Sequence, residues 1–217
     1  MPRPRIKICC MASPEEAHIC AAAGADLVGL VGPMPSGAGI VSPDTCREIA
    51  KAAPAWVTPV LLTSSETAEA IAADIRHAGV RAVQLVRHVE PEVHATLAED
   101  LPGVRRFQVI HVEGHDALDL IAHYPLADAF LLDSGRPSQA ELGGTARTHD
   151  WAVSADFVRQ SPVPVFLAGG LTPRNAAEAI AQVRPFGLDI CSGVRTPDDR
   201  LDPEKLHAFM AAIREAA

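Results

Sequence analysis

The sequence predicts a single (β/α)8 barrel over residues 1–217, and three observations lead to this fold class. Short apolar runs alternate with amphipathic stretches along the whole chain. The alternation repeats at roughly 22 to 35 residues, which gives eight strand–helix units that right-handed crossovers can close into a ring. Two apolar runs near the C-terminus end in small residues, at the place of strands seven and eight of such a barrel. A doubly wound open sheet is the competing architecture.

Eight apolar runs predict the strands. A run that is apolar throughout, such as 27–31, suits a strand that is buried on both faces. Residues 5–9 alternate instead, so Lys7 and Cys9 share one face of their strand. The expected strands are about 5–9, 27–31, 56–62, 81–86, 106–112, 129–133, 164–168 and 188–192.

Helix starts follow several of these strands. Ser13-Pro14 combines a serine that can cap a helix with a proline suited to its first turn, and acidic residues follow it. The same logic applies to Ser42-Pro43, Thr172-Pro173 and Asp202-Pro203. The longest expected loop, roughly 134–149, is polar and contains glycine. Loops of that length inside compact domains are usually functional.

Composition agrees with a barrel and excludes several classes of partner. Apolar residues make up 48% of the chain and aromatic residues 4%, which suits Ala-rich helices on a parallel sheet. The formal net charge is −8 without a basic cluster, so we expect neither nucleic acid nor an anionic membrane as a partner. No membrane span or signal peptide is recognisable. We therefore expect a cytoplasmic protein whose five cysteines are reduced.

The segments 167–171 and 189–194 suggest a phosphate ligand. Gly169-Gly170 and Ser192-Gly193 end their apolar runs, and small residues let the backbone approach a ligand closely. In a (β/α)8 barrel these strand ends hold the phosphate site. A tight turn alone is the alternative for Gly169-Gly170.

Catalytic groups of a barrel project from the carboxyl ends of its strands. This rule selects five side chains, namely Cys9, Cys10, Gln84, His111 and Asp133. A free cysteine is more often a small buried apolar residue, and Asp133 could equally cap a loop. Together, a thiol and a carboxyl group at one rim can serve as base and acid in moving protons on a sugar.

The ordered set of motifs resembles the phosphoribosylanthranilate isomerase family over nearly the whole chain. Each motif alone is weak evidence, whereas their common order is specific. The motifs are Lys7-Ile8-Cys9, Gly24-Ala25-Asp26, Ser42-Pro43, Val83-Gln84-Leu85, Leu131-Leu132-Asp133, Gly143-Gly144-Thr145 with Asp150-Trp151, Leu167-Ala168-Gly169-Gly170-Leu171 with Pro173 and Asn175, and Asp189 with Ser192-Gly193-Val194.

The resemblance implies an Amadori rearrangement of an N-phosphoribosyl amine in tryptophan biosynthesis, without a cofactor or a metal. It assigns Cys9 as the general base and Asp133 as the general acid. Cys9 would then need a nearby cation, for which Lys7 is a candidate, and Asp133 would need surroundings that keep its proton. The phosphate would lie on backbone N–H groups of Gly143, Gly144, Ala168, Gly169, Gly170, Ser192 and Gly193.

Several positions depart from the family pattern where the anthranilate portion would lie. The loop 33–41 carries neither Arg nor Lys, and Val86-Arg87-His88 replaces the usual His-Gly. Cys10 replaces a glycine. A smaller change lies in the phosphate loop, where Ala146 replaces a second glycine. Arg87 and Arg136 are the candidate replacements for the missing cation.

Two alternatives follow from these departures. One is a paralogue that acts on a different phosphoribosyl or sugar-phosphate substrate, and the other is a non-catalytic barrel that binds a phosphate ligand. Metal-dependent epimerases are disfavoured because His88 and His111 do not reproduce their ligand arrangement. The chain could be a monomer or a homodimer.

The remaining cysteines and histidines are assigned no role in catalysis. Cys10 should point away from the barrel axis, and Cys20, Cys46 and Cys191 look structural. The histidines expected to lie mainly on solvated surfaces are His18, His77, His94, His115, His123, His149 and His207.

Overall fold

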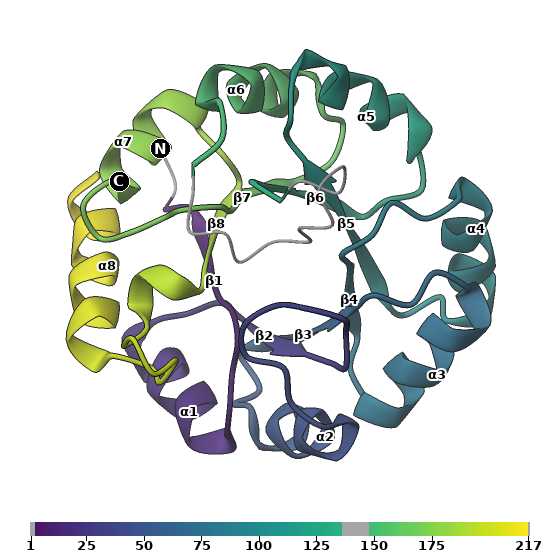
Figure 1. The fold of residues 1–217 in the computed structure, drawn as a ribbon, viewed down its shortest axis with the longest axis horizontal. Coiled ribbons are helices and arrows are strands. Elements are labelled where there is room, and N and C mark those ends of the chain that lie inside the picture. The colour runs from purple at the N-terminus through teal and green to yellow at the C-terminus, as the bar shows by residue number, and fades with distance from the viewer. Residues whose placement is uncertain (1–2, 136–147, 217) are drawn as a thin grey trace.

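The computed structural model describes residues 3–135 and 148–216, and within these ranges eight parallel strands close into a barrel. Each strand pairs with the next in the chain, and the last pairs with the first, so the predicted architecture is confirmed and the open sheet is excluded. Figure 1 shows the strands as an inner ring and the helices as an outer one. The strands are β1 (Arg5–Ile8), β2 (Leu27–Val31), β3 (Thr58–Thr63), β4 (Ala82–Leu85), β5 (Arg105–His111), β6 (Ala129–Asp133), β7 (Val165–Leu167) and β8 (Gly187–Ile190).

The helices cover the outside of the barrel, and most of the predicted start signals are confirmed. The Ser13 and Ser42 side chains accept hydrogen bonds from backbone N–H groups of the helices they precede. Among the described residues, no helix is long and apolar enough to cross a membrane. The helices are α1 (Pro14–Ala23), α2 (Pro43–Ala52), α3 (Ala68–Ala78), α4 (Pro91–Asp100), α5 (Leu120–His123), α6 (Trp151–Gln160), α7 (Ala176–Val183) and α8 (Pro203–Ala216).

Two predicted boundaries were wrong. α7 begins at Ala176 rather than at Pro173, because Thr172 and Asn175 first form a turn in which the Thr172 N–H donates to Asn175 Oδ1. β3 begins at Thr58 rather than at Trp56, whose side chain is 74% exposed before the strand enters the barrel.

Alternation along the strands separates two apolar regions. One lies between the strands and the helices, and the other fills the barrel interior. Inside, the Phe107 and Phe166 rings stack with their centroids 5.5 Å apart, while Ala82 and Ala129 leave room for them. Large and small residues on facing strands therefore fill the barrel interior toward its amino end. Polar side chains occupy its carboxyl end.

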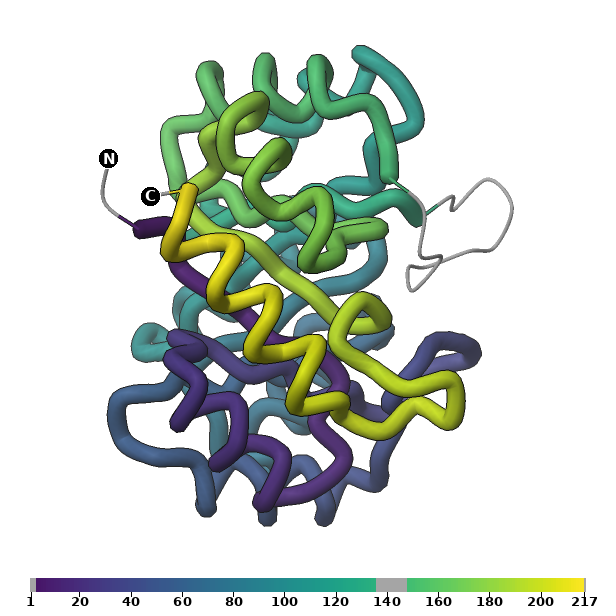
Figure 2. Tube along the Cα trace, turned by 90° about the vertical axis from the view of Figure 1, so that its left-hand side faces the viewer, coloured from purple at the N-terminus to yellow at the C-terminus, as the bar shows by residue number. Residues whose placement is uncertain are grey.

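The barrel closes where the first and last strands pair. β1 and β8 are in register from Arg5 opposite Gly187 to Ile8 opposite Ile190. Figure 2 shows α8, in yellow, lying across this region between α1 and α7. Closure therefore brings residues from opposite ends of the chain to the same edge of the site.

His94 does not lie on the surface as predicted. Its side chain is buried, and Nε2 lies 2.9 Å from Gln108 Oε1. Burial lowers the pKa of His94 below its usual value, so this histidine is a neutral packing residue between α4 and β5.

Gly187→Ala should destabilise the barrel where it closes. The added Cβ would meet the ring of Phe166 and would lie 2.8 Å from the Arg5 carbonyl oxygen, which leaves no room for it. We expect a loss of about 1–3 kcal/mol in the free energy of unfolding, measured by urea denaturation. Gly103→Ala is the matched control, because no described atom lies within 4 Å of the Cβ built there. Equal stability of the two variants would contradict the packing described here.

Candidate active site

A cavity that is open to solvent lies at the carboxyl end of the barrel. Residues from strands far apart in the sequence meet in its lining. The sequence-predicted side chains that line it are Cys9, Cys10, Gln84, Asp133, Ala168, Gly169, Gly170 and Ser192. His111 is buried at the same level of the barrel, and its Nε2 lies 3.0 Å from the Val86 carbonyl oxygen. The prediction that strand ends bring these residues together is therefore confirmed.

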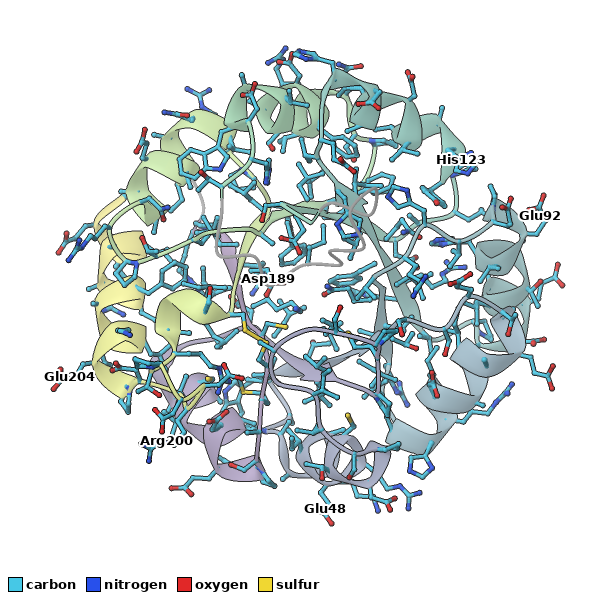
Figure 3. All side chains as sticks on the ribbon, viewed as in Figure 1. Glu48, Glu92, His123, Asp189, Arg200 and Glu204 are labelled. Atoms are coloured by element: carbon cyan, nitrogen blue, oxygen red, sulfur yellow. A yellow bond between two sulfur atoms is a disulfide. The ribbon has the colours of Figure 1, made fainter. Side chains whose placement is uncertain are left out.

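A buried ion pair lies beneath Cys9. Lys7 Nζ donates to Asp189 Oδ2 at 2.9 Å, and the Lys7 side chain is 0% exposed. The two residues are directly opposite each other on β1 and β8. Figure 3 shows Asp189 at the centre of the ring of strands, far from the labelled charged side chains on the outer surface.

Glycine at position 29 makes room for the thiol and the ammonium group. A Cβ built at Gly29 on β2 would lie 2.6 Å from Cys9 Sγ and 3.0 Å from Lys7 Nζ. Both atoms therefore occupy the space that a side chain at position 29 would fill. Lys7 is thus the neighbouring cation that the sequence suggested for Cys9.

The surroundings of Cys9 favour its neutral thiol in the free protein. Burial raises the pKa of the Cys9 thiol, and the Lys7 ammonium lowers it by less than burial raises it. Burial alone would lower the pKa of Lys7, but Asp189 and Cys9 together raise it above its ordinary value. Lys7 therefore stays charged and available to stabilise a thiolate. One cation that is already paired with Asp189 therefore does not offset the desolvation of Cys9.

Asp133 lies across the cavity at the end of β6. Burial raises the pKa of the Asp133 carboxyl group, although His111 and a hydrogen bond from the Ser134 N–H to Oδ1, 2.7 Å long, act in the opposite direction. A raised pKa is the direction expected for a group that donates a proton near neutral pH.

The two segments suggested for phosphate adjoin the cavity. Gly169 and Gly170 have φ values of +79° and +62°, which favour glycine, and a Cβ at Gly169 would lie 2.8 Å from Ser134 Oγ. Ser192 is exposed to the cavity, whereas Gly193 packs against the Leu171 backbone. Gly143, Gly144 and Ala146 lie outside the described residues.

The structure does not bring Arg87 to the cavity. Its Nη1 pairs with Glu66 Oε1 at 2.9 Å, and Arg87 is not among the residues that line the cavity. Arg136 lies outside the described residues. Toward the loop after β2, the described lining consists of Met34, Ser36, Gly37 and Ala38, without a cation.

Two cysteines of the cavity wall are paired, contrary to the expectation of five reduced thiols. Cys10 forms a disulfide with Cys191, and Cys9, Cys20 and Cys46 are free. Cys10 has a φ of +69°, so its side chain turns toward the end of β8 instead of continuing the alternation of β1. The expectation that it points away from the cavity was wrong for this reason.

Sequence reasoning assigned no role to Asp189 or Arg195. The alternation along 187–191 places Asp189 on the inner face with Cys191, so its position could have been inferred from the sequence. Arg195 is buried, pairs with Glu16 at 3.0 Å and donates to the Cys10 carbonyl oxygen. No local pattern marks a buried arginine, because its partners come from the other end of the chain.

Comparison with known proteins agrees with this geometry. Residues 6–212 match the family described as N-(5'phosphoribosyl)anthranilate (PRA) isomerase. The chain belongs to the PRA isomerase family. N-(5'-phosphoribosyl)anthranilate isomerase of Methanocella arvoryzae is 35% identical over 97% of this chain and 98% of its own. Family membership makes this chain an isomerase of tryptophan biosynthesis.

Solved structures of isomerases in this family have the same fold. Monomers generated from the dimeric phosphoribosylanthranilate isomerase of Thermotoga maritima superpose with a TM-score of 0.82 at 27% identity, covering 98% of this chain and 99% of that one. A phosphoribosyl anthranilate isomerase in complex with reduced 1-(o-carboxyphenylamino)-1-deoxyribulose 5-phosphate gives a TM-score of 0.82 at 26% identity, with the same coverage.

Removing the ion pair should move the pH dependence of the isomerase. In Lys7→Met/Asp189→Asn no buried charge is left unpaired. Cys9 loses the Lys7 cation, which lowers its pKa, together with the smaller opposing effect of Asp189, so the pKa of Cys9 should rise. A higher pKa means less thiolate at pH 7, so the rising limb of kcat/KM should shift to higher pH. Activity at pH 7 should fall about tenfold or more. Lys51→Met on the exposed end of α2 is the control. An unshifted profile in the double variant would show that Lys7 does not influence the ionisation on which turnover depends.

Proposed function

We propose that this chain converts phosphoribosylanthranilate to the corresponding 1-amino-1-deoxyribulose 5-phosphate, with Cys9 as the base and Asp133 as the acid. The observation that supports this proposal most is the order of strands around the barrel. β7 and β8 lie between β6, which carries Asp133, and β1, which precedes Cys9. A ribose held by its phosphate at β7 and β8 would therefore extend between the acid and the base.

The reaction needs no external electron acceptor. Asp133 donates its proton to the furanose ring oxygen as the C1–O bond breaks, and the nitrogen lone pair forms a C1–N iminium ion. Cys9 then removes the proton on C2. The electron pair of that bond forms a C1–C2 double bond and neutralises the iminium nitrogen. Proton return to C1 and loss of the hydroxyl proton on C2 give the ketose.

The direction of both pKa shifts suits this order of events. Burial raises the pKa of Asp133 and so favours its protonated form, which the first step needs. Cys9 acts only in the second step, when the newly formed iminium cation lies beside it and favours the thiolate. Lys7 adds a fixed positive charge near the sulfur.

Two buried acceptors in the cavity lining suit the hydroxyl groups of a sugar. Gln84 Oε1 and Asp189 Oδ1 have no hydrogen-bond donor among the described residues. Buried acceptors without a donor are costly, so a ligand that donates hydrogen bonds would stabilise them. The ribose hydroxyl groups are donors of the required kind.

The anthranilate ring would lie toward the loop after β2, beside Met34 and Ala38. The described lining there has no cation, and Arg136, the other candidate for a contact with the carboxylate, lies outside the described residues. We further propose that the enzyme acts in the cytoplasm on this small phosphorylated sugar, as a monomer or homodimer, without nucleic acid, membrane, metal or cofactor.

Turnover of phosphoribosylanthranilate generated in situ tests the proposed reaction. Loss of anthranilate-type fluorescence should show efficient conversion by the wild type. Cys9→Ser and Asp133→Asn should each lower kcat by about 10²–10⁴-fold, because each removes a proton-transfer group.

Two control variants make the same chemical changes as Cys9→Ser and Asp133→Asn at other positions in the chain. Cys46→Ser changes a buried thiol on α2, and Asp100→Asn changes an exposed carboxylate at the end of α4. Both should retain activity. A folded wild-type protein that binds inorganic phosphate but does not convert this substrate would favour the paralogue with another aglycone.

Ser192→Asp tests the phosphate site. The new carboxylate would face the cavity where the phosphate is proposed to bind, so like charges would repel each other. KM should rise at least about tenfold while kcat changes less, because the repulsion acts on bound substrate and transition state alike. Ser192→Asn has the same shape without the charge and should raise KM far less. Equal KM values for the two variants would contradict phosphate binding at this strand end.

A further inference from the structure

We infer that Cys10 and Cys191 form a reversible dithiol–disulfide site in the wall of the active cavity, with low-molecular-weight disulfides as the oxidant. The two residues are 181 positions apart in sequence, and their Cα atoms are 6.1 Å apart, within the range that a disulfide spans. Both line the cavity, and Figure 3 shows the sulfur–sulfur bond near Asp189, inside the ring of strands.

The bond joins the two strand ends on which the proposed chemistry depends. Cys10 directly follows Cys9, and Cys191 directly precedes Ser192. β1 and β8 are already paired below this point, since the Cys9 N–H donates to the Ile190 carbonyl oxygen at 2.8 Å. Oxidation thus changes the wall of the cavity without requiring the strands to move together.

Several contacts hold Cys10 in the orientation that pairing needs. Arg195 donates to its carbonyl oxygen, and the Met11 N–H after it donates to the Gly29 carbonyl oxygen at 3.0 Å. Gly39 in the loop after β2 packs so closely against Cys10 that any Cβ at position 39 would clash with it. The side chain is therefore fixed toward Cys191 by surrounding groups.

Cys10 and Cys191 differ in exposure, and this difference indicates which of them attacks the small disulfide. Cys191 is half-buried and reachable through the cavity, whereas Cys10 is 5% exposed. We assign Cys191 as the attacking thiol and Cys10 as the resolving thiol. Cys9 takes no part, because its sulfur occupies the space above Gly29 beside Lys7.

The exchange balances in two steps. The Cys191 thiol loses its proton and attacks oxidised glutathione, forming a mixed disulfide and releasing one glutathione thiolate, which takes up that proton. The Cys10 thiol then loses its proton and displaces the second glutathione, leaving the Cys10–Cys191 bond. Two protein thiols are oxidised, and one small disulfide is reduced to two thiols. Because a glutathionyl group on Cys191 would occupy the cavity, resolution by Cys10 clears the site.

Thiol mapping across a series of oxidised-to-reduced glutathione ratios tests this inference without relying on catalysis. Samples are quenched in acid, denatured, alkylated and mapped by mass spectrometry. Oxidising ratios should protect only Cys10 and Cys191, and excess reduced glutathione should return both to alkylation. Protection of Cys9, five alkylated cysteines in every sample, or protection that excess reductant never reverses would overturn the proposal.

Two variants test the assigned roles. Cys10→Ser should accumulate one glutathionyl group on Cys191, whereas Cys191→Ser should stay unmodified at Cys10, and Cys46→Ser should cycle like the wild type. Oxidation should also raise the Tm of the wild type by about 10 °C, because the bond closes a very long loop. It should not raise the Tm of either variant of the pair. An adduct on Cys10 in Cys191→Ser, or equal Tm values for oxidised and reduced wild type, would contradict the inference.

Discussion

The buried pair of Lys7 and Asp189 is the interaction on which the site depends. It lies where the first and last strands meet, so it exists only when the barrel has closed. Two charges in an apolar interior lose their hydration, and removing one partner of such a pair typically costs about 3–5 kcal/mol. A pair of this kind is weak evidence of stabilisation. Because the pair lies beside Cys9, we infer that its desolvation cost is retained for the electrostatic effect of the pair on the groups that line the cavity.

The apolar barrel makes these electrostatics possible. Phe107, Phe166 and the small residues around them fill the barrel interior on the side away from the cavity. Close packing there keeps water from reaching the polar side chains of the cavity from that end of the barrel. The same burial raises the pKa of both Cys9 and Asp133. One desolvating environment thus favours the protonated forms of the carboxyl group proposed as acid and of the thiol proposed as base.

The carboxyl ends of β1 and β8 are also held together from outside the cavity. Arg195 pairs with Glu16 and donates to the Cys10 carbonyl oxygen, which ties the segment after β8 to α1 and to the segment after β1. Within the cavity wall the disulfide connects the same two segments. The residues that we propose as base, phosphate contact and reversible disulfide therefore share one edge of the barrel, which these contacts tie together.

The sequence alone determined the alternation of strands and helices, because periodicity and helix caps are local properties of the chain. It also placed Cys9, Gln84 and Asp133 at strand ends, where parallel strands present their side chains to a common site. It did not reveal the partners of Lys7 and Arg195, the pairing of Cys10 with Cys191, or the burial of His94. Each of these depends on contacts between residues far apart in the chain. Only closure of the barrel brings such residues within bonding distance, and only the resulting loss of water decides which of them carry charge.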